Sequence, residues 1–113
     1  EDCDSVEKVA SATEKLVQLG VGAIVCMDDF VCSVALQVLA GKKIQVPQQI
    51  QIASFYDSTL LKYAKPAITS LWFDDRALGA LTCKVLLQYI QVIKAESKSL
   101  LGYELVIRES TLF

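Results

Sequence analysis

The chain has 113 residues, about one domain's length, and a net charge of −2. Its 11 lysines and arginines are scattered and form no basic stripe, so the segment is a poor candidate for gripping nucleic-acid phosphates itself. Apolar residues make up 53% and the mean hydropathy is +0.41, yet no apolar run approaches the roughly 20 residues that span a bilayer. We therefore expect either elements buried on two sides or a segment that packs against protein outside this sequence.

Four cysteines stand at positions 3, 26, 32 and 83, and the sequence has no histidine. No C-x-x-C pair occurs, which argues against a zinc site and against cysteine–histidine catalysis. We expect reduced, mostly buried thiols in a cytoplasmic protein, and the sequence leaves a disulfide between some pair open.

The first half of the chain predicts a helix, a strand and a second helix. Residues 4–19 repeat apolar side chains with helical spacing, and Asp4 can cap this helix with Glu7 three residues later. The short apolar run "GAIVC" at 22–26 is typical of a parallel strand covered on both faces. Helical spacing of apolar residues returns over 29–40.

The second half predicts, in order, a strand, a short helix, a strand, a long helix and a last strand. These elements are expected at 50–55, 57–65, 68–73, 75–95 and 103–109. Asp57 or Ser58 can cap the short helix, and Asp74 or Asp75 can cap the long one. Strands that alternate with helices predict a layered α/β fold with a mostly parallel sheet flanked by helices.

Three predicted strands end in the same way, with an apolar run that gives way to an aspartate. The segments are "IVCMDD", "ASFYDS" and "SLWFDD". Because ligands bind outside the carboxyl ends of parallel strands, we expect the side chains that follow these strands along one edge of the sheet. They are Asp28, Asp29, Tyr56, Asp57, Phe73 and Asp74.

These aspartates have a simpler role as helix caps, each worth about 1 kcal/mol. Two adjacent carboxylates, Asp28 and Asp29, follow the first strand, and one is enough for a cap. The other is repelled by its charged neighbour, and a hydroxylated ligand would stabilise it by donating hydrogen bonds. Among the aromatic residues, we expect Phe55 and Trp72 in the core. Tyr56 and Phe73 are expected at the loop ends, where a ring can stack on a sugar or a base.

The stretches "GAIVCMDDFVCSVALQVLAGKKIQVPQQIQIASFYDS", "PAITSLWFDDRALGALTCKVLL" and "ELVIREST" together resemble the C-terminal part of lactose-repressor-type bacterial transcription regulators. That family has a strand, Asn-Asp and a helix with small residues, then a Val-Pro-x-x-Ile connection and a strand ending in Gly-Phe-Asp-Asp. A Pro-x-Leu-Thr-Thr strand, a long helix that bears a glycine and a closing Arg-Glu-Ser-Thr follow. The likeness runs from about Val21 to Leu112 and keeps the order and spacing of these motifs.

The resemblance implies a periplasmic-binding-protein-like core of two α/β subdomains with a ligand cleft between them, a helix-turn-helix headpiece for operator DNA, and a homodimer. Residues 1–113 would be the C-terminal part of the ligand-sensing and dimerisation domain, without the headpiece and the first subdomain. Because the sequence starts at Glu1 without an initiator methionine, we expect a piece of a longer chain. The helix at 75–95 would cross to the other subdomain, which would explain the surplus hydrophobicity.

By position, the family's Asn-Asp falls on Asp28 and Asp29, of which Asp28 is expected to face the effector and Asp29 to cap the helix. The family's Asp-Asp falls on Tyr56 and Asp57, and its polar residue after the third strand falls on Phe73. The ligand contacts that the resemblance implies are therefore Asp28, Tyr56, Asp57 and Phe73. The two aromatic replacements favour a nucleoside-like, aromatic or larger glycosidic effector over a simple hexose, or a cleft that has lost effector binding.

The resemblance also places the dimer contact on the helix after the first strand and on the short helix after the second. The residues implied are Val31, Cys32, Leu60, Leu61 and Tyr63. Their alternative role is ordinary packing on the sheet.

Two other protein classes fit parts of the pattern. A phosphoacceptor receiver module would bind Mg²⁺ at "IVCMDD" and be phosphorylated on Asp57, but Asp57 comes too early for that fold. An extracytoplasmic sugar-binding protein of the same core fold is the nearer alternative, although the closing "RESTL" favours the regulators. With no histidine, nucleophile elbow or phosphate-cradling glycine loop, we expect no enzyme, no cofactor and no metal.

Overall fold

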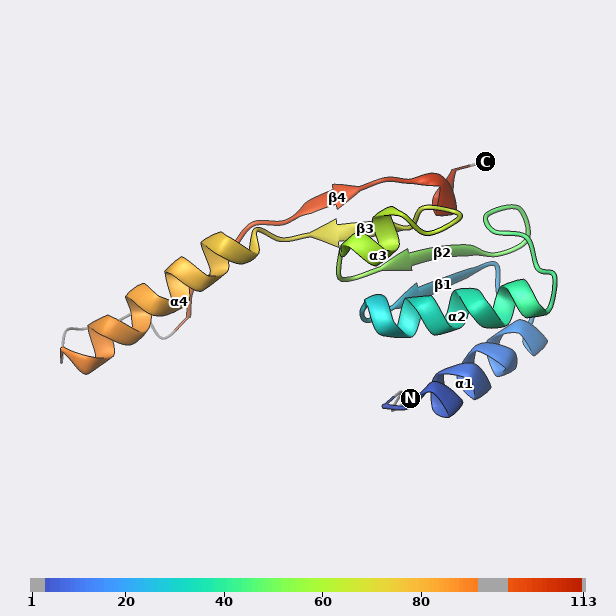
Figure 1. The fold of residues 1–113 in the computed structure, drawn as a ribbon, viewed down its shortest axis with the longest axis horizontal. Coiled ribbons are helices and arrows are strands. Elements are labelled where there is room, and N and C mark those ends of the chain that lie inside the picture. Colours follow the sequence, from blue (N-terminus) through green and yellow to red (C-terminus); the bar gives the residue numbers. More distant parts are fainter. Residues whose placement is uncertain (1–3, 92–97, 113) are drawn as a thin grey trace.

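Helices and strands alternate along residues 4–91 and 98–112, which the computed structural model describes (Figure 1). The helices are α1 (Val6–Gln18), α2 (Asp29–Gly41), α3 (Thr59–Lys62) and α4 (Asp75–Ile90); the strands are β1 (Ala23–Cys26), β2 (Gln51–Ser54), β3 (Thr69–Trp72) and β4 (Glu104–Val106). A short 3-10 helix at Glu109–Thr111 follows β4. The predicted α/β class is confirmed, and the predicted residues 92–95 of the long helix lie outside the described residues.

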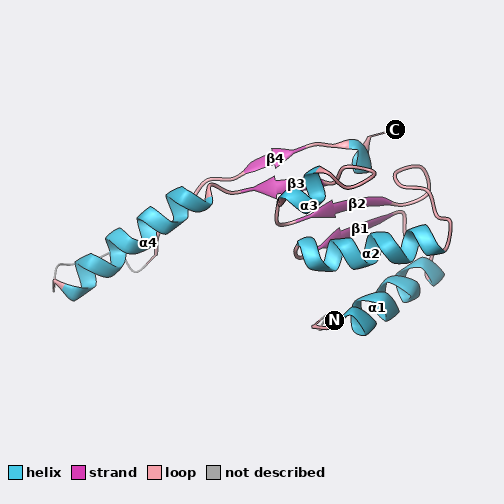
Figure 2. Ribbon diagram, in the orientation of Figure 1, coloured by secondary structure: helices cyan, strands magenta, loops and turns pink. Residues whose placement is uncertain are grey.

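The four strands form one sheet in the order β1-β2-β3-β4. β2 pairs in parallel with both β1 and β3, whereas β4 is antiparallel to β3. The sheet is therefore mostly parallel, as predicted. Figure 2 shows that the chain leaves the sheet at the end of β3, forms α4, and returns along β4.

The core lies between one face of this sheet and the first three helices. β1 alternates buried Ile24 and Cys26 with exposed Ala23 and Val25, which is the pattern of a strand covered on one face. The prediction of a strand covered on both faces is therefore wrong for this chain. The largest fully buried side chains are Leu39, Ile52, Leu61, Ile68, Val9, Cys32, Ser70 and Ser110.

α4 projects away from the sheet (Figure 1) and has no buried residue. Leu78, Leu86, Tyr89 and Ile90 are among its large apolar side chains that stay exposed. The helix stretches the molecule to 57 × 28 × 19 Å. As expected from the sequence, this helix has no packing partner within the described chain, and it is a large part of the surplus hydrophobicity.

Polar side chains cap three of the helices: Ser5 caps α1, Asp28 caps α2 and Asp74 caps α4. Ser5 rather than Asp4 caps α1, since Ser5 Oγ accepts a hydrogen bond from Lys8 N at 3.3 Å. Asp4 instead forms an ion pair with Lys8 Nζ at 2.7 Å. Asp74 caps α4 as predicted, accepting from Ala77 N at 3.1 Å, so α4 begins almost directly where β3 ends.

Buried hydroxyl groups fix the segment after β4 to the sheet. Ser110 Oγ donates to Ile52 O at 2.6 Å and accepts from Thr69 N at 2.9 Å. Thr69 Oγ1 accepts from Arg108 N at 2.8 Å and lies 2.7 Å from Thr111 Oγ1. The returning segment is thereby joined to both β2 and β3.

A largely buried ion pair between Asp57 and Arg108 joins the end of β2 to the segment after β4. Arg108 donates from Nη1 to Asp57 Oδ1 at 2.7 Å and from Nη2 to Oδ2 at 3.1 Å. Ser70 Oγ donates to Asp57 Oδ1 at 2.6 Å. The Arg108 and Asp57 side chains are only 14% and 11% exposed. The Arg108 guanidinium, helped by the Ser70 hydroxyl and opposed by burial, holds the pKa of Asp57 below its usual 3.8.

We expect Ser110→Ala to lower the free energy of unfolding by about 1–3 kcal/mol, because it leaves the Thr69 amide and the Ile52 carbonyl without their buried partner. Urea unfolding of the chain measures the change. Ser11→Ala, on the exposed side of α1, is the matched control and should stay within about 0.5 kcal/mol of the parent. Equal losses in the two variants would contradict the role given to Ser110.

The Asp57–Arg108 pair also predicts a pH dependence. Because the pKa of Asp57 is lowered in the folded state, its contribution to stability is complete above 3.8 and is lost as the pH falls through the folded-state value. We expect the parent to be more stable than Asp57→Asn at neutral pH and this gap to shrink below pH 3.8. Asp4→Asn, at an exposed ion pair, is the control, and a gap independent of pH would refute the assignment.

Candidate functional site

The parallel pairing brings the ends of three strands to one edge of the sheet. Cys26 pairs with Ser54, and Ser54 pairs with Ser70, so the residues that follow leave the sheet in neighbouring rows. In Figure 1 the arrowheads of β1, β2 and β3 point to the same side, from which α4 departs. The segments 27–29, 55–57 and 73–75 therefore form a common rim, which we call the carboxyl rim.

Asp28 is the rim residue that caps α2. Its Oδ1 accepts a hydrogen bond from Val31 N at 2.8 Å. The prediction that Asp29 would be the cap is wrong: the Asp29 carboxylate accepts from the adjacent Phe30 N at 2.9 Å. Capping uses Oδ1 of Asp28, and the residue is exposed, so the role of a cap and that of a ligand contact are compatible.

Tyr56 lies at the rim, in a turn that is held by hydrogen bonds to Ser54. Ser54, the last residue of β2, is buried; its Oγ accepts from Tyr56 N at 3.1 Å and donates to Tyr56 O at 2.8 Å. The Tyr56 side chain is 39% exposed. The backbone of Tyr56 is thus fixed while part of its ring faces outward, which is the arrangement a stacking surface needs.

Asp57 differs from its neighbour because its carboxylate is already engaged. Both of its oxygens accept from Arg108, and Oδ1 also accepts from Ser70. Asp57 therefore has a structural role in this fold, and its predicted ligand contact stays a prediction. The residue still borders the rim, where its ion pair supports the turn that carries Tyr56.

A hollow of about 660 Å³ opens beside Tyr56. It is lined by Tyr56, Asp57, Ser58, Thr59, Lys62, Trp72, Asp75, Val106 and Arg108. Ser58 Oγ is buried there without a hydrogen-bond partner among the described residues. The hollow combines two aromatic rings with hydroxyl, ammonium and carboxylate groups, which is a lining suited to a polar ligand with many hydroxyls.

Two aromatic predictions at this edge are wrong. Trp72 is 44% exposed and Phe55 is 49% exposed, although both were expected in the core. Trp72 is the last residue of β3, where the helices no longer cover the sheet. Its position at a strand end was visible in the sequence and could have placed it at the rim beside Phe73, which is partly buried.

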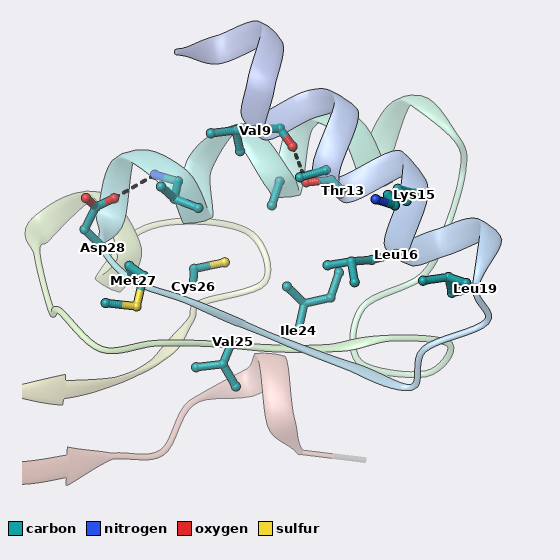
Figure 3. Close-up of a pocket in the computed structure, with 13 residues that line it drawn as sticks. Val9, Thr13, Lys15, Leu16, Leu19, Ile24, Val25, Cys26, Met27 and Asp28 are labelled. Atoms are coloured by element: carbon teal, nitrogen blue, oxygen red, sulfur yellow. Dashed lines mark hydrogen bonds between the residues drawn. The ribbon is translucent and has the colours of Figure 1, made fainter. Parts of the chain in front are cut away.

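A second hollow is a groove of about 610 Å³ between α1 and β1 (Figure 3). The walls of the groove are mostly apolar. Val9 and Leu16 of α1, together with Leu19 just after α1, face Ile24 and Cys26 of β1. Asp28 lines the end of this groove, whereas Tyr56 and Asp57 line the other hollow. The structure thus places Asp28 and Tyr56 on one rim but in different hollows, and Phe73 lines neither.

Some of the residues predicted for the dimer contact are buried in the core, and others are exposed. Cys32 and Leu61 are completely buried and contact the core, so the prediction that they meet a second copy is wrong. Val31 is partly buried and packs against the same core. Leu60 and Tyr63, at 65% and 70% exposure, are available on and next to α3.

Residues 4–91 and 98–112 contain no group of three or more cysteine, aspartate or glutamate side chains arranged to hold a metal ion. Within the same residues, no helix is both long and apolar enough to cross a membrane.

Comparison with known proteins places the fold in a family. Residues 3–111 match the periplasmic binding protein-like domain. The HTH-type transcriptional regulator MalR of Streptomyces coelicolor is 27% identical over 108 residues, which cover 95% of this chain and 31% of that regulator. The chain thus spans about a third of this relative's length.

Solved structures agree with this match. A LacI family transcriptional regulator from Bifidobacterium animalis has a TM-score of 0.86 and 29% identity, covering 96% of this chain and 41% of that one. A probable maltose operon transcriptional repressor from Staphylococcus aureus has a TM-score of 0.85 and 26% identity, covering 99% and 41%. The chain therefore belongs to the periplasmic binding protein-like domain family, in the form found in lactose-repressor-type transcription regulators.

Proposed function

We propose that residues 1–113 are the C-terminal part of the effector-sensing and dimerisation domain of a cytoplasmic transcription regulator. The carboxyl rim forms one wall of a small-molecule cleft, and the rest of the regulator supplies the opposite wall. The observation that supports this most is the path of the chain around α4: it leaves the rim at Asp74, exposes an apolar helix to solvent, and returns along β4. An exposed apolar helix of this kind is expected to pack against a second subdomain on the far side of the rim.

This path also suggests how a ligand could act. β3 and β4 are neighbours in the sheet and together form the connection to α4. A ligand that bridges the two walls would favour the closed arrangement, and the bias is limited by its differential affinity for the closed and open states. In this proposal the change in angle reaches operator DNA through a headpiece outside this chain, as the description of the relative MalR as HTH-type suggests.

The side chains at the rim favour a glycosidic or nucleoside-like effector. Tyr56 and Trp72 offer partly exposed rings for stacking on a sugar face or a base. Asp28 and the polar groups of the 660 Å³ hollow can hydrogen-bond to hydroxyls, and Phe73 adds apolar surface at the adjoining rim segment. A saccharide fits the description of a similar structure as a probable maltose operon repressor.

The decisive experiment is a ligand screen on the full-length regulator. Isothermal titration with maltose, cellobiose and nucleosides would be paired with a gel-shift assay of operator binding. The proposal expects one ligand class to bind and to change operator affinity. Absence of both effects across the panel, with operator binding intact, would leave the domain without its sensing role.

We expect Asp28→Ala to weaken the effector response of the full-length regulator about tenfold or more, because a hydrogen bond to a charged group is worth about 1.5–3 kcal/mol. Operator release as a function of effector concentration measures this. Asp28→Ser is the matched variant, since serine caps a helix about as well as aspartate but reaches less far. Serine should keep the parent's thermal stability and still respond weakly; a normal response would mean that Asp28 serves α2 alone.

The dimer contact is proposed on Leu60 and Tyr63, the exposed members of the predicted set. We expect Leu60→Glu to weaken the homodimer at least tenfold, because the change buries a charge in an apolar contact. Sedimentation equilibrium of the full-length regulator measures the dimer dissociation constant. Leu19→Glu, an exposed leucine next to α1, is the control and should leave that constant unchanged.

A further inference from the structure

β1 is an edge strand within the described residues, and its outer side carries unpaired backbone groups. The sheet order is β1-β2-β3-β4, so within these residues β1 pairs with β2 alone. Backbone amides at the two ends of β2 donate to the Gly22 and Cys26 carbonyls, each at 2.9 Å. Because the backbone groups of successive residues point to opposite sides of a strand, those of Val25 point away from β2.

β1 also has none of the features that usually protect an edge strand. Its sequence, Ala-Ile-Val-Cys, contains no charged residue and no proline, and its register with β2 runs one to one without a bulge. The side chain of Val25 is 59% exposed. An apolar, regular edge of this kind is a template for pairing with a further strand.

The helix layer extends beyond this edge. α2 contacts both β1 and β2, and α1 packs against α2 on the side that faces away from β2 (Figure 1). Neighbouring helices lie about 8–10 Å apart, whereas neighbouring strands lie about 4.8 Å apart, so each helix covers roughly two strands. α1 therefore lies over a place beyond β1 where the described chain has no strand. The groove of about 610 Å³ occupies this place (Figure 3).

The groove presents apolar surface from both walls. Ala12 and Leu16 of α1 are only partly buried, and Leu19, just after α1, is 70% exposed. Val25 and Met27 border the groove from the side of β1 and are also exposed. A β-strand with apolar inward side chains would cover this surface and supply the missing backbone partners of Val25.

The path of the chain indicates the direction and the side of such a strand. Only the short turn at 19–22 separates α1 from β1, so α1 runs opposite to β1 and begins at the carboxyl rim. A strand that ends at the rim and leads into α1 therefore runs parallel to β1. Parallel crossovers are right-handed, and α1 covers the same face of the sheet as α2, which leads from β1 to β2. The strand before α1 consequently lies on the side of β1 that faces away from β2.

We propose that a β-strand from the part of the regulator that precedes residue 1 pairs in parallel with β1 and fills the groove under α1. This rests on the proposed function, in which the chain is one part of a longer regulator; the matched residues are 31% of MalR. In the complete domain β1 is then an interior strand. The added strand ends at the carboxyl rim, on the side of the segment that contains Asp28.

Residue-resolved hydrogen–deuterium exchange of the full-length regulator tests this pairing. The amides of Ile24 and Val25 are compared, because Ile24 faces β2 and Val25 faces the groove. We expect both amides to exchange at least roughly 100-fold more slowly than in an unfolded peptide. An edge strand would protect Ile24 and leave Val25 unprotected, and smaller protection of Val25 than this would overturn the proposal.

A dilution series separates the proposed strand from a second copy of the protein. Exchange is repeated over the concentrations at which the regulator dissociates into monomers. Protection of Val25 that disappears with the dimer would assign the groove to the second copy and refute the proposal. The measurement uses neither effector nor operator, so a ligand screen that fails leaves its result unchanged.

Ala12→Glu adds a carboxylate on the groove side of α1, and Ser11→Glu adds the same group on its exposed side as the matched control. Because a carboxylate enclosed under a strand is costly, we expect the exchange rate of Val25 to rise by roughly tenfold or more in Ala12→Glu only. Equal rates in the two variants would contradict a filled groove. The comparison of Ile24 with Val25 in the unmodified regulator stands even if Ala12→Glu folds poorly.

Discussion

Parallel pairing of β1, β2 and β3 is the constraint on which the candidate site depends. Once these strands run in one direction, every connection out of them starts at the same edge, and the side chains just beyond each strand become neighbours. The helices that follow need acceptors at their first turns, so the proposed recognition positions are also the positions where helix caps are needed. Asp28 supplies the cap of α2 with one carboxylate oxygen.

The antiparallel return of β4 adds a different kind of support. Its hydrogen bonds to β3 place Arg108 beside Asp57, one residue beyond Tyr56. A carboxylate and a guanidinium that are both largely buried are stable only when they are paired and hydrogen-bonded. The turn below Tyr56 is therefore held by residues that come from two distant parts of the chain, the end of β2 and the segment after α4.

The order of the elements and the sheet direction could be predicted from sequence, because apolar spacing and strand–helix alternation are local properties. The choice between Asp28 and Asp29 as the cap could not, since adjacent carboxylates differ only in backbone direction. The burial of Cys32 and Leu61 depends on which side of a helix meets the sheet. The sequence shows that Trp72 stands near a strand end, but the extent of its exposure depends on how far the covering helices reach along the strands.

The buried serines have a consequence for strand alignment. Ser54, Ser70 and Ser110 are enclosed, and each hydroxyl is hydrogen-bonded. Ser54 bonds to its own turn at Tyr56, whereas Ser70 and Ser110 have partners on other segments, Asp57 and Ile52. If β3 slipped by one residue, Ser70 would turn to the opposite side and Asp57 would lose its hydroxyl donor. Hydrocarbon contacts alone would tolerate several such alignments, whereas these small polar groups are satisfied in one, so they select a single arrangement of the sheet.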